Sequence, residues 1–219
     1  MPSMQFSELK ESVRALRKHL LPSKFDPTGN YRERVFTGVV AFRVLCHAAI
    51  EDYFESRAIE IARSALSQCR ATGRVSLPAI ALLSFSGRAH SLPPDTIDPP
   101  DPSMKKGWSS EIEFKQRLND CTTEFIRRVT KDNHGVREKN ILWMLIPLGI
   151  DPGDIDRLFL SEIDNFGSIR GDYAHKSPAV HTVKKPDPKD ELAKINGLLG
   201  LIEPVDRKLD FLLALTKAQ

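Results

Sequence analysis

The chain has 219 residues, of which 41% are hydrophobic and 28% are charged. This composition excludes a disordered chain, and the length suits one domain with an elaborated loop, so we treat residues 1–219 as a single domain. The 32 basic and 29 acidic residues leave a net charge of +3. That charge permits a polyanionic partner but is far below the basic surplus of a dedicated nucleic-acid-binding protein.

Cysteine use and hydropathy predict a cytoplasmic protein. Cys46, Cys69 and Cys121 are widely spaced and form no Cys-x-x-Cys pair, which argues against a disulfide framework and against a zinc ribbon. The first ten residues lack a basic flank followed by an apolar run, and the longest nearly apolar stretch, 141–150, is about half the length that crosses a bilayer. We therefore expect neither secretion nor membrane contact.

Apolar residues recur at helical spacing along almost the whole chain, and no Asn-Gly or Asp-Gly dipeptide separates two β-branched runs. The pattern predicts an all-α bundle of about six or seven helices. The first helix is predicted over 6–20. Asn30 as N-cap, with Glu33 three residues later, predicts the start of an unusually long second helix that continues to about Cys69.

The middle of the chain combines a short helix with a proline-rich insertion. The short helix is predicted over 78–88. Five prolines fall between Pro93 and Pro102, and they predict an extended inserted loop over about 91–108. A helix capped at Ser110 then runs to about Lys131, where Asn133-His134-Gly135 ends it.

Three further helices complete the predicted bundle. Residues 136–148 form one, and the turn at 151–154 leads into another over about 155–174. The apolar face of this second helix is predicted to consist of Leu158, Ile163, Phe166 and Ile169. Asp187 is the predicted N-cap of the last helix, which Pro204 is expected to kink.

Three polar residues of the long helix, Arg43, His47 and Glu51, follow one another at i, i+4 spacing and so share a face. One interpretation is a set of hydrogen bonds and ion pairs within or between helices. The alternative is that these side chains line a functional cleft. Both remain open at the level of the sequence.

Arg170 and His175 are separated by four residues at the end of the helix predicted over 155–174. The structural interpretation is that both cations stabilise the C-terminal end of the helix through its dipole, by about 0.3–1 kcal/mol each. The functional interpretation depends on the rest of the second half of the chain. Asn133-His134-Gly135-Val136, Asn140-Ile141-Leu142 and Leu148-Gly149-Ile150-Asp151 precede the pair.

With these segments, the second half of the chain resembles the HEPN superfamily, and its RiboL-PSP type in particular. The segment from His47 to Tyr53 in the long helix is also similar to the opening helix of that type. The resemblance covers roughly Tyr31 to Pro178. It implies a HEPN-like bundle that forms a homodimer and brings the Arg-x4-His motifs of two chains into one cleft, which cuts RNA without a metal ion.

Helix geometry agrees with a shared cleft, because residues five apart point about 140° from each other and do not converge easily within one chain. In such a cleft His175 would move the proton between the ribose 2′-hydroxyl and the leaving 5′-oxygen. Arg170 would bind the phosphate and stabilise the charge that develops in the transition state. The expected products carry a 2′,3′-cyclic phosphate and a 5′-hydroxyl.

The chain departs from the family pattern at two positions. Active members often have a polar residue after the arginine, where this chain has Gly171 and places its carboxylate at Asp172. Asp172 could orient His175 or Arg170, or it could be a solvated acid at the helix end. In HEPN proteins paired with nucleotidyltransferase antitoxins a modified tyrosine lies two residues after the histidine, whereas this chain has Ser177.

No metal or cofactor is predicted. Only His47 and Glu51 have a spacing suited to metal ligands, and the chain contains no glycine-rich phosphate loop and no nucleophile elbow. The resemblance implies an RNA substrate, a setting in stress response, toxin action or defence, and an antitoxin or regulatory protein as a partner. The alternative is a non-catalytic HEPN-like module that binds RNA, a nucleotide or a protein.

Overall fold

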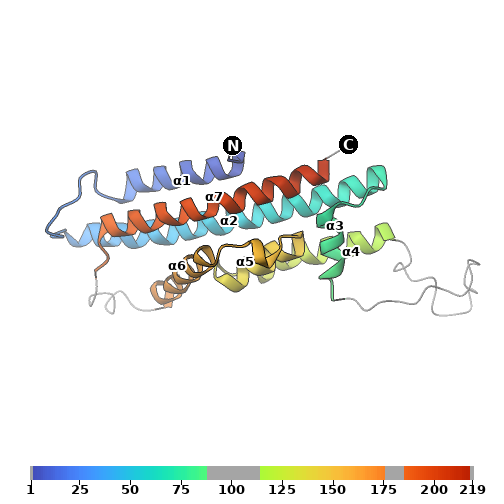
Figure 1. The fold of residues 1–219 in the computed structure, drawn as a ribbon. Coiled ribbons are helices and arrows are strands. Elements are labelled where there is room, and N and C mark those ends of the chain that lie inside the picture. Colours follow the sequence, from blue (N-terminus) through green and yellow to red (C-terminus); the bar gives the residue numbers. More distant parts are fainter. Residues whose placement is uncertain (1, 88–113, 176–184, 218–219) are drawn as a thin grey trace, which may run out of the picture.

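The structure, a computed structural model, describes residues 2–87, 114–175 and 185–217, and for 169–175 it describes the backbone only. These residues form seven α-helices and three short helical turns, with no strand among them (Figure 1). The prediction of an all-α bundle with one long helix near the N-terminus is confirmed. The predicted loop at 91–108 and the cap at Ser110 lie outside the described residues.

Three helices form one side of the bundle. The long helix α2 (Glu33–Thr72) has 40 residues, which corresponds to about 60 Å. The last helix, α7 (Pro188–Lys217), lies beside it, and α1 (Met4–Leu20) packs along both (Figure 1). The N-cap prediction for α7 is confirmed, because a side-chain oxygen of Asp187 accepts hydrogen bonds from two backbone amides of the first turn. Pro204 lies inside the continuous α7.

The remaining helices cover the other side of α2. Helix α3 (Leu77–Ser84) packs near the C-terminal end of α2. Helix α4 (Phe114–Arg127) continues into a π-helical turn, η1 (Arg128–Asp132). Helix α5 (Glu138–Leu145) passes into the 3₁₀ turn η2 (Ile146–Leu148).

A second 3₁₀ turn, η3 (Pro152–Asp154), precedes α6 (Arg157–His175). Helix α6 ends at the end of the bundle where α2 and α7 begin (Figure 1). At that end Lys185, just before α7, forms an ion pair of 2.5 Å with Glu33 in the first turn of α2.

One continuous apolar core contains buried side chains from all seven described α-helices. Its fully buried side chains come from α1, α2, α5, α6 and α7 and include Phe6, Phe42, Phe54, Ile141, Leu145, Phe159, Ile163, Ile195 and Leu209. A smaller cluster joins α2, α3 and α4. The core thus fixes α6 against α2 and α7 before the run from Arg170 to His175 begins.

The predicted N-cap at Asn30 is wrong. Helix α2 begins at Glu33, and its N-cap, Arg32, makes no side-chain capping hydrogen bond. The reason lies in the preceding turn, where the Asp26 carboxylate accepts hydrogen bonds from the backbone amide and hydroxyl of Thr28. This turn continues to Tyr31, whose hydroxyl oxygen accepts from the Asp26 amide, and Asn30 therefore stays outside the helix.

Two other predicted boundaries move. The helix predicted over 78–88 ends at Ser84, and Gly87 has a positive φ of 69° that belongs to the following turn. The helix predicted over 136–148 begins at Glu138 and tightens into η2, since Pro147 has no backbone N–H to donate. The element order is as predicted.

The predicted apolar face of α6 is wrong at Leu158, whose side chain is 56% exposed. Helix α6 starts at Arg157, and the Asp156 carboxylate accepts a hydrogen bond from the Leu158 amide at the N-terminal end. This start directs Phe159 into the core together with Ile163 and Phe166. The side chain of Ile169 lies outside the described residues.

At Gly38 the end of α1 lies very close to α2, because a Cβ atom there would overlap the backbone carbonyl oxygen of Leu20. We expect Gly38→Ala to lower the free energy of unfolding by about 1–3 kcal/mol, since backbone must move to make room. The exposed Gly197 in α7 is the control, because a Cβ atom there meets nothing within 4 Å. Gly197→Ala should raise the free energy of unfolding by about 0.5–1 kcal/mol. Urea denaturation measures both, and wild-type stability of Gly38→Ala would contradict the expectation.

Candidate functional site

Arg170, Asp172 and His175 all lie in the last two turns of α6, whose helical backbone continues to His175. The prediction that this run is part of a helix is therefore confirmed up to His175, and the residues that follow lie outside the described ranges. The side chains of these three residues lie outside the described residues. The neighbouring side chains that hold this half of α6 are described.

Phe166 attaches α6 to the long helix four residues before Arg170. Its ring stacks on the imidazole of His47, with ring centroids 5.6 Å apart and an interplanar angle of 28°. The guanidinium carbon of Arg43 lies 5.5 Å from the centroid of the same ring. Two polar residues of α2, one turn apart, thus contact one buried aromatic side chain of α6.

Arg43 also forms a buried ion pair with the last helix. Its Nη1 donates hydrogen bonds of 3.0 Å to both carboxylate oxygens of Glu191. The side chains are only 6% and 3% exposed, and Lys194 in α7 donates to Glu191 Oε1 at 3.0 Å. Buried charges require such pairing, because their removal from water is costly. The pair joins the first half of α2 to the start of α7.

The His47 ring contacts Phe166 of α6 and Glu51 of its own helix, and it also packs against the turn before α5. The ring is 1% exposed, and its Nδ1 lies 3.7 Å from Glu51 Oε2 on the same helix. A Cβ atom added at Gly135 would contact the ring at 3.7 Å, so this glycine packs directly against His47. Arg43 and His47 are therefore buried by contacts within and between helices, which is the first of the two interpretations that the sequence left open.

The Asn133-His134-Gly135 turn is tied to α2 and α5 by side-chain amides. Asn133 Nδ2 donates to Glu55 Oε1 at 2.7 Å, and Asn140 Nδ2 donates to Asn133 Oδ1 at 2.8 Å. Burial raises the pKa of Glu55, which the hydrogen bond from Asn133 partly offsets. His134 itself is exposed.

The thiol of Cys46 lies in the same part of α2. Burial, together with the nearby charge of Glu191, raises its pKa to about 12. Because the thiolate is the reactive form of cysteine, Cys46 stays a neutral thiol at physiological pH. Cys69 and Cys121 are also buried. None of the three thiols has the exposed, electropositive setting of a nucleophile.

A groove of about 1230 Å³ opens between α3, η1 and α5. Two exposed aromatic side chains, Phe85 and Trp143, line it, and Lys139 Nζ lies 5.2 Å from the centroid of the Trp143 ring. The apolar lining also includes Leu82, Phe125, Val129, Leu142, Met144, Ile146 and Pro147. The sequence analysis did not anticipate this groove, since its walls come from helices that are separated in the sequence.

Several charged side chains around this groove form ion pairs with one another. Arg128 pairs with Glu124 at 3.0 Å, and Arg137 pairs with Asp164 at 3.1 Å. Hydrogen bonds from Arg127 and Arg128 lower the pKa of Glu124 to about 2. The acids therefore stay charged at neutral pH and hold these arginines near them.

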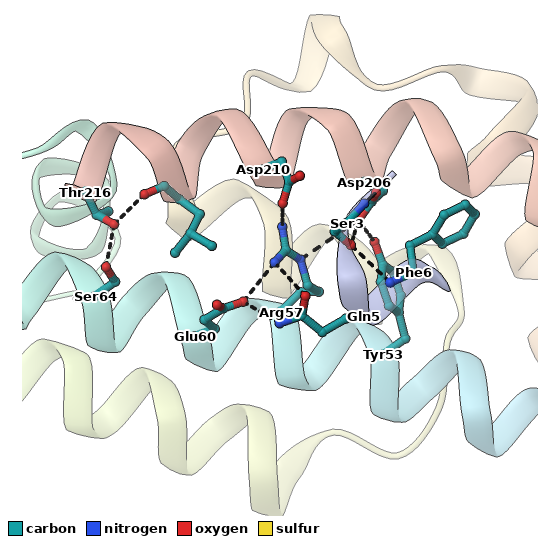
Figure 2. A network of polar contacts seen from close by, with 11 residues as sticks. Ser3, Gln5, Phe6, Tyr53, Arg57, Glu60, Ser64, Asp206, Asp210 and Thr216 are labelled. Atoms are coloured by element: carbon teal, nitrogen blue, oxygen red, sulfur yellow. Dashed lines mark hydrogen bonds and ion pairs between the residues drawn. The ribbon is translucent and has the colours of Figure 1, made fainter. Parts of the chain in front are cut away.

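A second polar network lies near the middle of α2 (Figure 2). The fully buried Asp206 in α7 accepts hydrogen bonds from the Ser3 amide at 2.8 Å, the Ser3 hydroxyl at 2.5 Å and the Tyr53 hydroxyl at 2.7 Å. Arg57 approaches Asp206 at 4.0 Å and pairs with Asp210 at 2.5 Å. The network joins the start of α1 to α2 and α7.

In the described ranges, no group of three or more histidine, cysteine, aspartate or glutamate side chains is arranged to hold a metal ion. The helices of the same ranges include none that is long and apolar enough to cross a membrane. Comparisons with protein-family models, with curated proteins and with solved structures found no match to this chain.

Proposed function

We propose that the chain is a metal-independent endoribonuclease of the HEPN-like kind, with Arg170 and His175 of two copies in one cleft. The observation that carries the proposal is the placement of both residues in the last two turns of α6, directly after Phe166, whose ring stacks on His47 and contacts the guanidinium of Arg43. A helix held in this way presents its end in a fixed position. The resemblance of the sequence supplies the chemistry.

In the proposed reaction His175 accepts the proton of a ribose 2′-hydroxyl, whose oxygen attacks the adjacent phosphorus. The P–O5′ bond breaks, and the leaving 5′-oxygen takes a proton from the imidazolium of a histidine in the cleft. Arg170 binds the non-bridging phosphate oxygens and stabilises their growing charge. Asp172 orients one of these two side chains. The products are a 2′,3′-cyclic phosphate and a 5′-hydroxyl.

The helical backbone favours a homodimer as the active form. Arg170 and His175 are five residues apart on a helix, and such positions point about 140° from each other. A twofold axis beside the end of α6 lets the arginine of one protomer meet the histidine of its partner. We place the protein in the cytoplasm, in stress response, toxin action or defence, with an antitoxin or regulatory protein as partner.

Labelled single-stranded and structured RNA, incubated with the purified chain in EDTA, tests the proposal. Wild type should cut, and Arg170→Ala and His175→Ala should cut at least about 100-fold more slowly. Mixing the two slow variants should restore part of the activity, because a mixed dimer retains one intact arginine and histidine pair across the twofold axis. No restoration would contradict the shared cleft, and equal cleavage by wild type and both variants would contradict the site.

The second candidate function is a non-catalytic module that binds RNA, a nucleotide or a protein. The groove with its exposed Trp143 and Phe85 favours it, since exposed aromatic rings offer stacking surfaces. Fluorescence anisotropy with the same RNA separates the two functions. Binding that is lost in Trp143→Ala, together with intact RNA after incubation with wild type, would support the module and contradict the nuclease.

A further inference from the structure

The cluster formed by Arg43, His47, Phe166 and Glu191 lies at the point where three helices meet. Arg43 and His47 contribute from α2, Phe166 from α6 and Glu191 from α7. All four side chains are buried. Phe166 is the last described apolar side chain that α6 buries before the run from Arg170 to His175.

Stability alone does not account for a buried ion pair at this place. Apolar side chains of similar volume often fill such a site with equal or better stability, because a charged pair must be removed from water. Unlike apolar contacts, the ion pair also restricts the positions of the groups that form it. Nη1 of Arg43 must stay within reach of both Glu191 oxygens, and the same guanidinium must stay over the ring of Phe166.

Gly167 adds a steric limit on the other side of α6. A Cβ atom at this position would lie 2.9 Å from Arg137 Cγ and 3.1 Å from the Arg137 backbone nitrogen, so the helix backbone lies almost against the start of α5. Phe166 and Gly167 thus hold α6 between α2 and the 136–137 segment. Neither rotation nor sliding of α6 is possible without breaking one of these contacts.

We propose that Arg43 and Glu191, through Phe166, are positioning residues for the end of α6, an inference that rests on the proposed function of Arg170 and His175. Along a helix, His175 lies about 13.5 Å beyond Phe166. A tilt of about 4° at Phe166 therefore moves the end by about 1 Å, a displacement that can cost about 100-fold in rate. The buried pair suppresses this tilt.

The chain contains a matched control for the test. Arg57 is also a buried arginine of α2 that pairs with α7, but it belongs to the Asp206 network and lies about 21 Å along the helix from Arg43. Arg43→Met and Arg57→Met remove the same charge from the same two helices. Only Arg43→Met is expected to disturb the end of α6.

The test measures two quantities on the full chain, namely amide hydrogen exchange in 168–175 and the steady-state kinetics of RNA cleavage. For Arg43→Met and Glu191→Gln we expect exchange in 168–175 at least tenfold faster than in wild type. We expect kcat to fall at least tenfold. KM should stay unchanged, because Arg43 and Glu191 act on the position of α6 and do not themselves bind the RNA. Arg43→Lys should recover part of kcat, and Arg57→Met should leave exchange in 168–175 and kcat at wild-type values.

The double variant Arg43→Met/Glu191→Leu guards against simple misfolding, because it fills the site with apolar side chains and leaves no unpaired charge. It should be folded and still show the fast exchange and low kcat. The proposal is overturned if Arg43→Met and Arg57→Met give the same exchange in 168–175. RNA left intact by wild type would instead contradict the proposed function, while the exchange rates would still decide whether the cluster holds the helix end.

Discussion

His175→Ala is expected to lower the rate of RNA cleavage by about 10²–10⁴-fold, the range by which general acid–base catalysis accelerates such reactions. The proposed site uses an imidazole to take the 2′-hydroxyl proton and to protonate the leaving oxygen. Alanine does neither. KM should change less than kcat, because Arg170 still binds the phosphate.

His134→Ala is the matched control for this prediction. His134 is exposed and lies in the turn before α5, outside the proposed cleft. Its replacement should leave cleavage at the wild-type rate. Initial rates with saturating and limiting RNA give kcat and KM for both variants. A His175→Ala protein that cuts RNA at the wild-type rate would remove His175 from the mechanism.

The largest expected effect on stability is that of Asp206→Ala, which should lower the free energy of unfolding by about 3–5 kcal/mol. The carboxylate of Asp206 is fully buried and accepts hydrogen bonds from Ser3 and Tyr53 (Figure 2). Removal of the Asp206 carboxylate leaves the buried Tyr53 hydroxyl without the acceptor of its hydrogen bond. Burial already raises the pKa of Tyr53, so the hydroxyl stays protonated and keeps its need for an acceptor.

Asp210→Ala provides the comparison, since Asp210 pairs with the same Arg57 but its side chain is 41% exposed. Because water solvates the Asp210 side chain and Glu60 still pairs with Arg57, we expect Asp210→Ala to lower the free energy of unfolding by only about 1 kcal/mol. Urea denaturation at neutral pH, with equal m values, measures both changes. Equal destabilisation by the two variants would show that burial of Asp206 is not the source of its contribution.

The helices themselves were largely predictable from the sequence, because apolar spacing and capping residues are local signals. Asp187 correctly predicted the start of α7 as its N-cap. The N-cap at Asn30 was wrong because the Asp26 turn extends to Tyr31, a competition between local hydrogen bonds that a capping pattern does not reveal. The prediction that Leu158 belongs to the apolar face of α6 was wrong because Asp156 caps the helix and so determines where it starts.

The candidate site was predictable only where its residues are close in the sequence. The shared face of Arg43 and His47 follows from i, i+4 spacing, but Glu191, the partner of Arg43, lies 148 residues away. No spacing rule connects them. A glutamate in the first turn of α7 is equally compatible with a solvated acid, which the helix dipole favours. The Asp206 network and the groove escaped prediction for the same reason.

The chemical ends on cut RNA test the central claim most directly. Wild-type protein in EDTA should leave a 2′,3′-cyclic phosphate on one fragment and a 5′-hydroxyl on the other, as mass spectrometry of the products would show. An RNA whose 2′-hydroxyls are all methylated should remain intact, since the attacking oxygen is blocked. Products with 5′-phosphate and 3′-hydroxyl ends, or cleavage of the methylated strand, would contradict attack by the 2′-hydroxyl and with it the proposed roles of Arg170 and His175.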